Sequence, residues 1–172
     1  ANVTTSRGSK ELLCIMRILL VGGSGFIGPH VAWPLIRGGH DVVVFHRGRT
    51  PAPPGTQEII GDRRRLAEHA ASLRGAGADV IVDLVLSSGA QARTLIDLMR
   101  GHTGRIVALS SCDVYRACGI THRLEEGPPE LVPLTESSRL RTKLQTYPPE
   151  QIRMLQEVFA WADDEYDKIP VE

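Results

Sequence analysis

Three glycines at intervals of three residues, Gly22, Gly25 and Gly28, are the sequence feature with the clearest chemical meaning. They stand between a continuous apolar run, residues 18–21, and a segment whose apolar residues recur at helical spacing. In a strand–turn–helix unit the first glycine permits a tight turn, the second lets a pyrophosphate approach the backbone, and the third lets the helix pack closely on the sheet. The amides and dipole of the helix start then hold the phosphates. The pattern predicts a dinucleotide-binding turn, the alternative being a tight turn without a ligand.

The residues after the second expected strand predict which dinucleotide would bind. A carboxylate there would accept hydrogen bonds from the ribose hydroxyls of NAD. The chain instead has His46, Arg47, Gly48 and Arg49, which offer no carboxylate and two guanidinium groups that can pair with a 2′-phosphate. We therefore predict NADP, with NAD as the alternative if these arginines are only solvated. His46 is expected to be a loop residue near the adenosine.

Segments beyond the glycine turn carry a family resemblance. Gly61-Asp62 follows the third expected strand, residues 109–115 read LSSCDVY, and residues 133–136 read PLTE. With the GxxGxxG turn, these segments resemble the extended branch of the short-chain dehydrogenase/reductase superfamily, the NAD-dependent epimerase/dehydratase family. The resemblance runs from residue 16 to residue 172 and implies that Asp62 lies near the adenine. The predicted cofactor-binding residues are Gly22, Gly25, Phe26, Ile27, Gly28, Arg47, Asp62, Arg63 and Leu84.

The same resemblance implies a catalytic serine, tyrosine and lysine. Ser111, four residues before Tyr115, matches the serine position, and Lys168 matches the lysine position because residues 168–172 reproduce a KxxxE spacing. In the family the tyrosine moves a proton while the nicotinamide moves a hydride, and the lysine lowers the tyrosine pKa and holds the nicotinamide ribose. The alternative for Ser111 is a serine that only ends a strand.

The tyrosine position departs from the family pattern. Tyr166 is the predicted acid/base, yet it precedes Lys168 by two residues, and Asp164 occupies the position four residues before the lysine. Residues four apart share a helix face, whereas residues two apart point in nearly opposite directions. Either the backbone is irregular there or the pair is broken, with Tyr115 as an alternative proton donor.

An alternation of strands and helices is expected to position these residues. Apolar runs predict strands at residues 18–21, 41–45, 58–60, 79–86 and 105–110, with helices between them and a last helix over residues 149–161. Such alternation demands a parallel sheet with right-handed crossovers. We predict an α/β, doubly wound, Rossmann-like domain over residues 16–172, after a disordered extension, residues 1–15. As in a fragment, the domain would lack the C-terminal substrate region, and its sheet would lack a last strand. The missing strand would leave an exposed edge and an uncovered apolar face.

Composition narrows the range of partners. The 20 basic and 20 acidic side chains balance among 172 residues, which gives no electrostatic reason to expect nucleic acid or an anionic membrane. The three cysteines form no CxxC pair, which favours a reducing, cytoplasmic setting. We expect a small-molecule substrate and, from the resemblance, a homodimer. No metal is predicted, since no histidine has a partner at metal-ligand spacing. Cys112 is expected to be a packed thiol, and residues 63–65 a solvated helix start, although Arg63 could flank the adenine.

Three functional hypotheses follow from the sequence. The first is an NAD(P)-binding oxidoreductase domain that transfers a hydride at a carbinol or carbonyl carbon, for example of a nucleotide-linked sugar. The second keeps the dinucleotide without the chemistry, as a redox-sensing or partner-binding module, and the spacing of Tyr166 and Lys168 favours it. The third is a fragment that neither folds well nor works alone.

Overall fold

A five-stranded parallel sheet forms the centre of the computed structural model, which describes residues 14–130, 132–142 and 149–158. Its strands are β1 (Arg17–Val21), β2 (Asp41–His46), β3 (Gln57–Ile60), β4 (Val80–Asp83) and β5 (Arg105–Ala108). Their order is β3-β2-β1-β4-β5, and each neighbouring pair is parallel. The chain therefore extends the sheet from β1 in both directions, which confirms the predicted α/β, doubly wound class.

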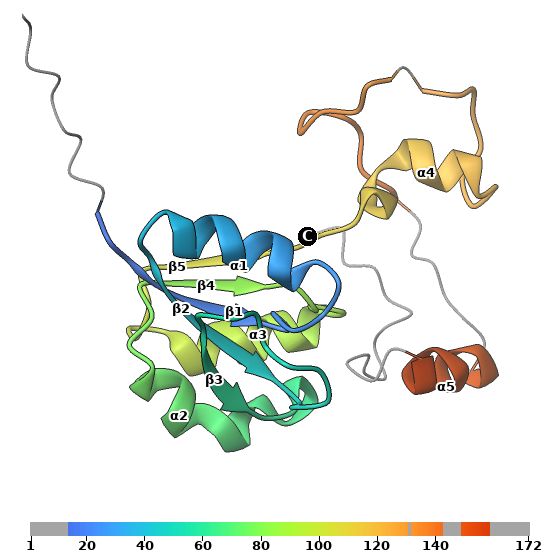
Figure 1. The fold of residues 1–172 in the computed structure, drawn as a ribbon. Coiled ribbons are helices and arrows are strands. Elements are labelled where there is room, and N and C mark those ends of the chain that lie inside the picture. Colours follow the sequence, from blue (N-terminus) through green and yellow to red (C-terminus); the bar gives the residue numbers. More distant parts are fainter. Residues whose placement is uncertain (1–13, 131, 143–148, 159–172) are drawn as a thin grey trace, which may run out of the picture.

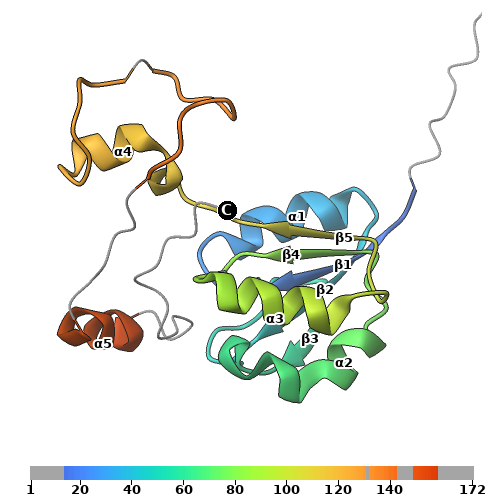
Figure 2. The ribbon, with the colours of Figure 1, turned by 180° about the vertical axis from the view of Figure 1, so that it is seen from behind.

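Helices cover both faces of the sheet (Figure 1). One face carries α1 (Gly28–Arg37), and the other carries η1 (Arg63–His69), α2 (Ala70–Gly75) and α3 (Gly89–Met99) (Figure 2). The alternation of side chains along β1 explains the two layers. Leu19 packs in the core with α2 and α3, whereas Leu20 packs in the core beside α1. Because both cores are apolar, the central strands read as continuous apolar runs in the sequence.

Local signals set the helix ends. Asp62 accepts a hydrogen bond from the Arg64 backbone N–H at 2.9 Å and caps η1, while Ser88 accepts one from the Gln91 N–H at 3.2 Å and caps α3. Gly39, just past the end of α1, adopts a φ of +83°. Pro34 lies inside α1 on its exposed side, and nothing in the structure gives it a functional role.

The fourth strand is shorter than the run of apolar residues predicts. β4 ends at Asp83, whose carboxylate accepts the backbone N–H of Val85 at 3.1 Å, and one further backbone bond runs from the Leu84 N–H to the Val21 carbonyl at 3.0 Å. At the other side of β4, β5 forms an edge in which Val107 is 44% exposed, as is Leu109 just beyond it. Within the described ranges, the expected exposed edge and apolar surface are therefore present.

The segment after β5 leaves the sheet (Figures 1 and 2). It contains η2 (Cys112–Val114) and α4 (Arg116–Thr121), and a later helix, α5, spans Pro149–Val158. A backbone bridge joins Tyr115 to Leu140 and closes the loop that follows α4. No helix among the described residues is both long and apolar enough to span a bilayer. The predicted extension, residues 1–15, and the end of the predicted last helix, residues 159–161, lie largely outside the described residues.

Candidate functional site

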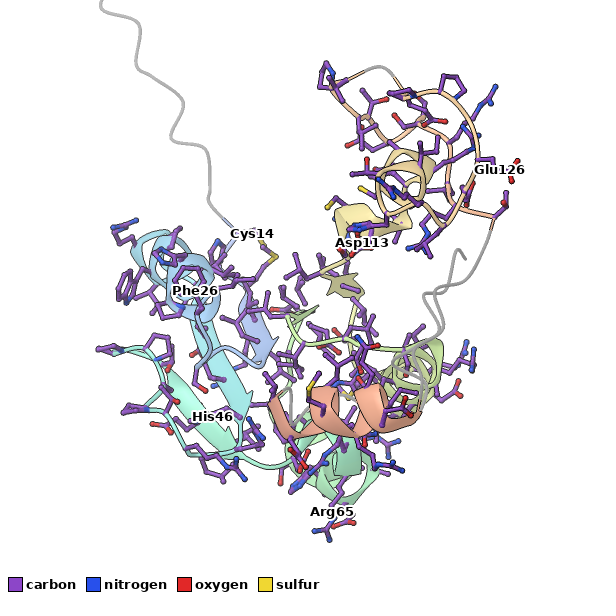
Figure 3. The ribbon with its side chains drawn as sticks, turned by 90° about the vertical axis from the view of Figure 1, so that its right-hand side faces the viewer. Cys14, Phe26, His46, Arg65, Asp113 and Glu126 are labelled. Carbon is purple, nitrogen blue, oxygen red and sulfur yellow. The ribbon has the colours of Figure 1, made fainter. Side chains whose placement is uncertain are left out.

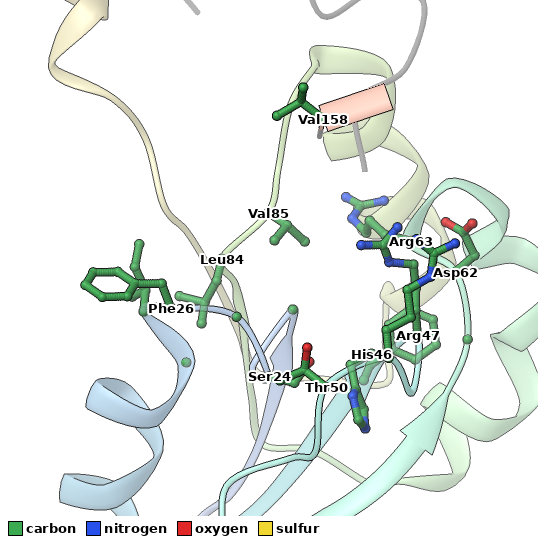
Figure 4. A pocket seen from close by; sticks show the side chains of 17 residues that line it. Ser24, Phe26, His46, Arg47, Thr50, Asp62, Arg63, Leu84, Val85 and Val158 are labelled. Atoms are coloured by element: carbon green, nitrogen blue, oxygen red, sulfur yellow. The ribbon is translucent and has the colours of Figure 1, made fainter. Parts of the chain in front are cut away.

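A pocket of about 560 Å³ opens at the carboxyl edge of the sheet, within the volume range of small-molecule sites (Figure 4). Every residue predicted to bind the cofactor lines it, including Ile27 and Leu84. The lining also includes Arg49 and His46, which the sequence placed near the adenosine. It further includes six residues that the sequence did not single out for this role: Ser24, Phe45, Thr50, Gly61, Val85 and Val158. The carboxyl edge of a doubly wound sheet is where the ligands of such folds bind.

The three glycines of the turn differ in why the chain needs them. Gly22 has a φ of +81°, and a Cβ there would lie 2.5 Å from the side chain of Val85. A Cβ on Gly28 would lie 1.9 Å from the carbonyl oxygen of Gly23, so no side chain fits. Gly25 is different, because its Cβ would meet only the Gly22 carbonyl oxygen at an ordinary 3.5 Å. The protein's own packing therefore accounts for Gly22 and Gly28 but not for Gly25.

The start of α1 opens beside this turn without a side-chain cap. Ile27, at the N-cap position, makes no capping hydrogen bond, and Pro29 follows at the first turn. The first turn carries no acidic side chain that would neutralise the positive end of the helix dipole. Uncapped N-terminal amides beside a pocket suit the phosphates of a ligand.

A cationic wall follows the end of β2 (Figure 4). Arg47 and Arg49 both line the pocket, and neither makes a hydrogen bond or ion pair with any other described residue. Asp62 stands on the same side. Partial burial acts to raise the pKa of the Asp62 carboxyl, but hydrogen bonds from Arg64 and the charges of Arg64 and Arg47 outweigh it, so that pKa lies below its ordinary value. A carboxylate therefore does lie near Arg47, although it comes from the loop after β3 rather than from the end of β2.

Arg63 corrects the expectation that residues 63–65 form a solvated helix start. Its side chain is 5% exposed, and its Nε and Nη2 atoms donate to Oδ2 of the fully buried Asp83 at 3.0 and 2.8 Å. Nη2 also donates to the backbone carbonyl of Gln91 at 3.1 Å. This pair joins the start of η1 to the end of β4 and the start of α3, and so fixes one side of the pocket. Arg64 and Arg65 are exposed, as predicted.

His46 corrects a second expectation, since it is the last residue of β2 rather than a loop residue. The imidazole is buried, and its Nε2 atom lies 2.8 Å from Oε2 of Glu58 on the neighbouring strand. Its Nδ1 atom is buried and has no hydrogen-bond partner in the described part of the chain. The pair of β2 and β3 therefore holds this ring in place beneath the cationic wall.

The opposite wall of the pocket is apolar (Figure 4). Phe26 and Leu84 lie across from Arg47 and Asp62, and Val158, at the end of α5, lies beyond Val85. Phe26 is 90% exposed, which is unusual for an aromatic ring and offers apolar surface to a bound molecule. The pocket thus has a cationic side after β2 and an apolar side over the start of α1.

The predicted catalytic residues are only partly described. Ser111 is exposed at the N-cap of η2, where its hydroxyl oxygen accepts the backbone N–H of Asp113 at 3.2 Å, and it does not line the pocket. This bond caps η2 rather than ending β5, which stops at Ala108, and the catalytic role of Ser111 stays a prediction. Tyr115 is half-buried at the N-cap of α4. Tyr166, Lys168 and Asp164 lie outside the described residues.

The expectation that Cys112 is a packed thiol was wrong. Cys112 is an exposed free thiol rather than a packed one. The imidazole of His122 lies near η2, with its Nε2 atom 3.5 Å from Oδ1 of Asp113, and the absence of a metal stays a prediction. Only the folding of η2 and α4 brings these side chains together.

Two pocket residues stand next to motifs that the sequence does reveal. Ser24 stands inside the glycine turn, and Thr50 closes the loop that carries the two arginines. Both supply hydroxyl groups at the floor of the pocket (Figure 4). Val158, by contrast, carries no local signal, because α5 reaches the pocket only through the tertiary fold.

A doubly wound sheet with a glycine turn before α1 and a pocket at its carboxyl edge defines a Rossmann-like domain. The family model described as "NAD dependent epimerase/dehydratase family" matches residues 18–135, and the chain belongs to that family. This confirms the resemblance that the sequence carries.

Individual relatives agree with this assignment. The chain is 28% identical over 151 residues to a 2'-dehydrokanamycin reductase of Streptomyces kanamyceticus, covering 86% of this chain and 39% of that protein. It is 29% identical over 131 residues to a UDP-glucose 4-epimerase of Corynebacterium glutamicum, covering 70% of this chain and 39% of that protein. The chain therefore spans well under half the length of these relatives.

Solved structures show the same fold. The UDP-glucose 4-epimerase of Brucella ovis in complex with NAD aligns with a TM-score of 0.57 at 18% identity, covering 84% of this chain and 49% of that one. At this identity, the likeness concerns the fold alone.

Proposed function

We propose that this chain is the NADP-binding domain of an oxidoreductase of the epimerase/dehydratase family. Gly25 carries the proposal, because the protein's own packing gives no reason for a glycine there, whereas a pyrophosphate that approaches the backbone requires one. The uncapped start of α1 supports the same placement. When bound, the nicotinamide would supply a hydride acceptor or donor for a carbinol or carbonyl substrate.

The two ends of the cofactor would meet the two sides of the pocket. Arg47 and Arg49 are available to pair with the 2′-phosphate of the adenosine ribose, which favours NADP over NAD. Asp62, held ionised by its neighbours, suits hydrogen bonding to the adenine amino group. The apolar surface of Phe26 and Leu84 would lie toward the pyrophosphate and nicotinamide side.

The chemistry would rest on residues beside and beyond the pocket. Ser111 would hold the substrate oxygen, Tyr166 would move its proton, and Lys168 would hold the nicotinamide ribose. The substrate would be a small molecule, with a nucleotide-linked sugar as the leading class, since the relatives include an enzyme named for UDP-glucose. We also propose a cytoplasmic location and a homodimer, as the sequence predicts.

Titration of the purified chain with NADP, NADPH and NAD tests the binding step. Calorimetric affinity and the rise of the melting temperature should both favour the phosphorylated forms. Failure of a cooperatively melting chain to bind any of the three would overturn the proposal. Turnover of a carbonyl substrate by the chain, lost in Tyr166→Phe, would separate an enzyme from a binding module that lacks chemistry.

A further inference from the structure

The segment after β5 carries a second cluster of reactive side chains, outside the pocket (Figure 3). Cys112, Asp113 and Cys118 each present a ligand atom, and these three atoms all lie within 4.8 Å of one another. The imidazole of His122 lies beside Asp113, with its Nε2 atom 3.5 Å from Oδ1 of that residue. The four side chains bring together two sulfurs, one carboxylate and one imidazole.

Two short helices, η2 and α4, bring these side chains together. Cys112 and Asp113 begin η2, whose start is capped by the Ser111 hydroxyl. Cys118 lies in α4, and the backbone N–H of His122 donates to the Cys118 carbonyl at 2.9 Å. Helical hydrogen bonding therefore continues to His122, and residues four apart share a helix face. Two ligands at this spacing on one helix can bind one ion.

The donor atoms of the cluster suit a divalent cation. Cys112 and Cys118 supply sulfur, and Asp113 supplies carboxylate oxygen. A coordinated thiol loses its proton, so the bound ligands would present negative charge to the ion.

We propose that Cys112, Asp113, Cys118 and His122 bind one Zn²⁺ ion. Thiolate, imidazole and carboxylate are the donors that zinc takes in four-coordinate sites. With Zn–S bonds of about 2.3 Å, tetrahedral ligand atoms lie about 3.8 Å apart. Among Cys112, Asp113 and Cys118 the observed separations exceed this by at most about 1 Å, which side-chain rotation can cover. The exposed His122 side chain, which already contacts Asp113, would rotate to supply the fourth ligand. Cys112 is exposed, so the ion has a path into the cluster.

The role of this site would be structural. All four coordination positions come from the protein, which leaves no open position for a substrate. The ion would tie η2 to the end of α4 and so hold the backbone directly after Ser111. It would thereby order the segment that joins the sheet to the region beyond α4.

Cobalt binding to the full 172-residue chain, reduced with a phosphine that does not bind metals strongly, tests the proposal. One Co²⁺ per chain should bind with thiolate-to-cobalt absorption and the intense d–d bands of a tetrahedral site, and Zn²⁺ should displace it. Cys112→Ser and Cys118→Ser should each weaken Zn²⁺ binding at least about 100-fold, above the 10- to 100-fold typical when a group that only orients a ligand is lost. His122→Ala and Asp113→Asn should weaken it at least about 10-fold.

Matched controls use the chain's other exposed cysteine and an exposed histidine outside the cluster. Cys14→Ser and His102→Ala should bind both metals as the unsubstituted chain does. A second measurement needs no variant, because Zn²⁺ should protect Cys112 and Cys118, but not Cys14, from alkylation by iodoacetamide. The absence of thiolate absorption in a folded, reduced chain, or equal alkylation of the three cysteines with and without Zn²⁺, would overturn the proposal. These readouts do not involve the dinucleotide pocket.

Discussion

Arg63 and Asp83 form a buried ion pair with two hydrogen bonds, which joins the start of η1 to the end of β4. The remaining carboxylate oxygen of Asp83 accepts the backbone N–H of Val85, so the pair also shapes the chain segment that lines the pocket. Arg63 lies on the same side of the pocket as Arg47 and Asp62 (Figure 4). The integrity of the pair therefore bears on both stability and ligand binding.

Breaking this pair should destabilise the fold strongly. Arg63→Leu leaves the Asp83 carboxylate buried without its cation, which costs about 3–5 kcal/mol in the free energy of unfolding. Urea denaturation measures it. Arg65→Leu is the matched control, because Arg65 pairs with Glu68 at the exposed surface and its loss should leave the midpoint nearly unchanged. Equal midpoints for the two variants would contradict the structural role of Arg63.

Substitutions in the glycine turn should affect ligand binding and folding stability separately. Gly25→Ala should melt like the unsubstituted chain, since its Cβ meets only one atom, at an ordinary contact distance. It should nevertheless weaken NADP binding at least about 10-fold, or about 1.4 kcal/mol, because the methyl group occupies the path of the pyrophosphate. Gly28→Ala should instead lower the free energy of unfolding by about 1–3 kcal/mol or more, because its Cβ would overlap the Gly23 backbone. Unchanged affinity in Gly25→Ala would count against the proposed placement.

Arg47 should decide between the two dinucleotides. Arg47→Leu removes a charged donor to the 2′-phosphate, worth about 1.5–3 kcal/mol, or about 10- to 150-fold in affinity for NADP. Affinity for NAD should change little, so the ratio of the two dissociation constants is the informative quantity. Arg37→Leu, at the exposed far end of α1, serves as the control. A ratio that is the same in both variants would remove the argument for NADP.

The ionisation of Asp62 should make the stability of the fold depend on pH in the acid range. Its pKa is lowered in the folded chain, so its ionised form contributes stability above the ordinary value of 3.8 and loses that contribution as pH falls through the lowered pKa. Asp62→Asn keeps an N-cap but loses the ion pair with Arg64. The melting temperature of Asp62→Asn should therefore be lower at pH 7 and approach that of the unsubstituted chain below about pH 3.8. A gap that stays constant with pH would show that the charge of Asp62 contributes nothing.

Much of the fold could be predicted from local patterns in the sequence. The apolar runs identified all five strands, because a strand buried on both faces needs apolar residues throughout. The glycine turn identified the pocket wall, since both the turn and a close ligand approach exclude side chains at particular positions. The cofactor-binding residues that the turn and the resemblance predicted do line one pocket.

The tertiary structure decided which charged groups are solvated and which are paired. In the sequence, Arg63 is indistinguishable from the exposed Arg64 and Arg65, and only its burial against Asp83 separates them. His46 likewise finds Glu58 only because β2 and β3 are adjacent. Cys112 and Asp113 meet Cys118, and His122 meets Asp113, because η2 lies against α4. Local composition determines where strands, turns and helices form, but contacts between residues far apart in the chain depend on how those elements pack, and no short sequence pattern encodes them.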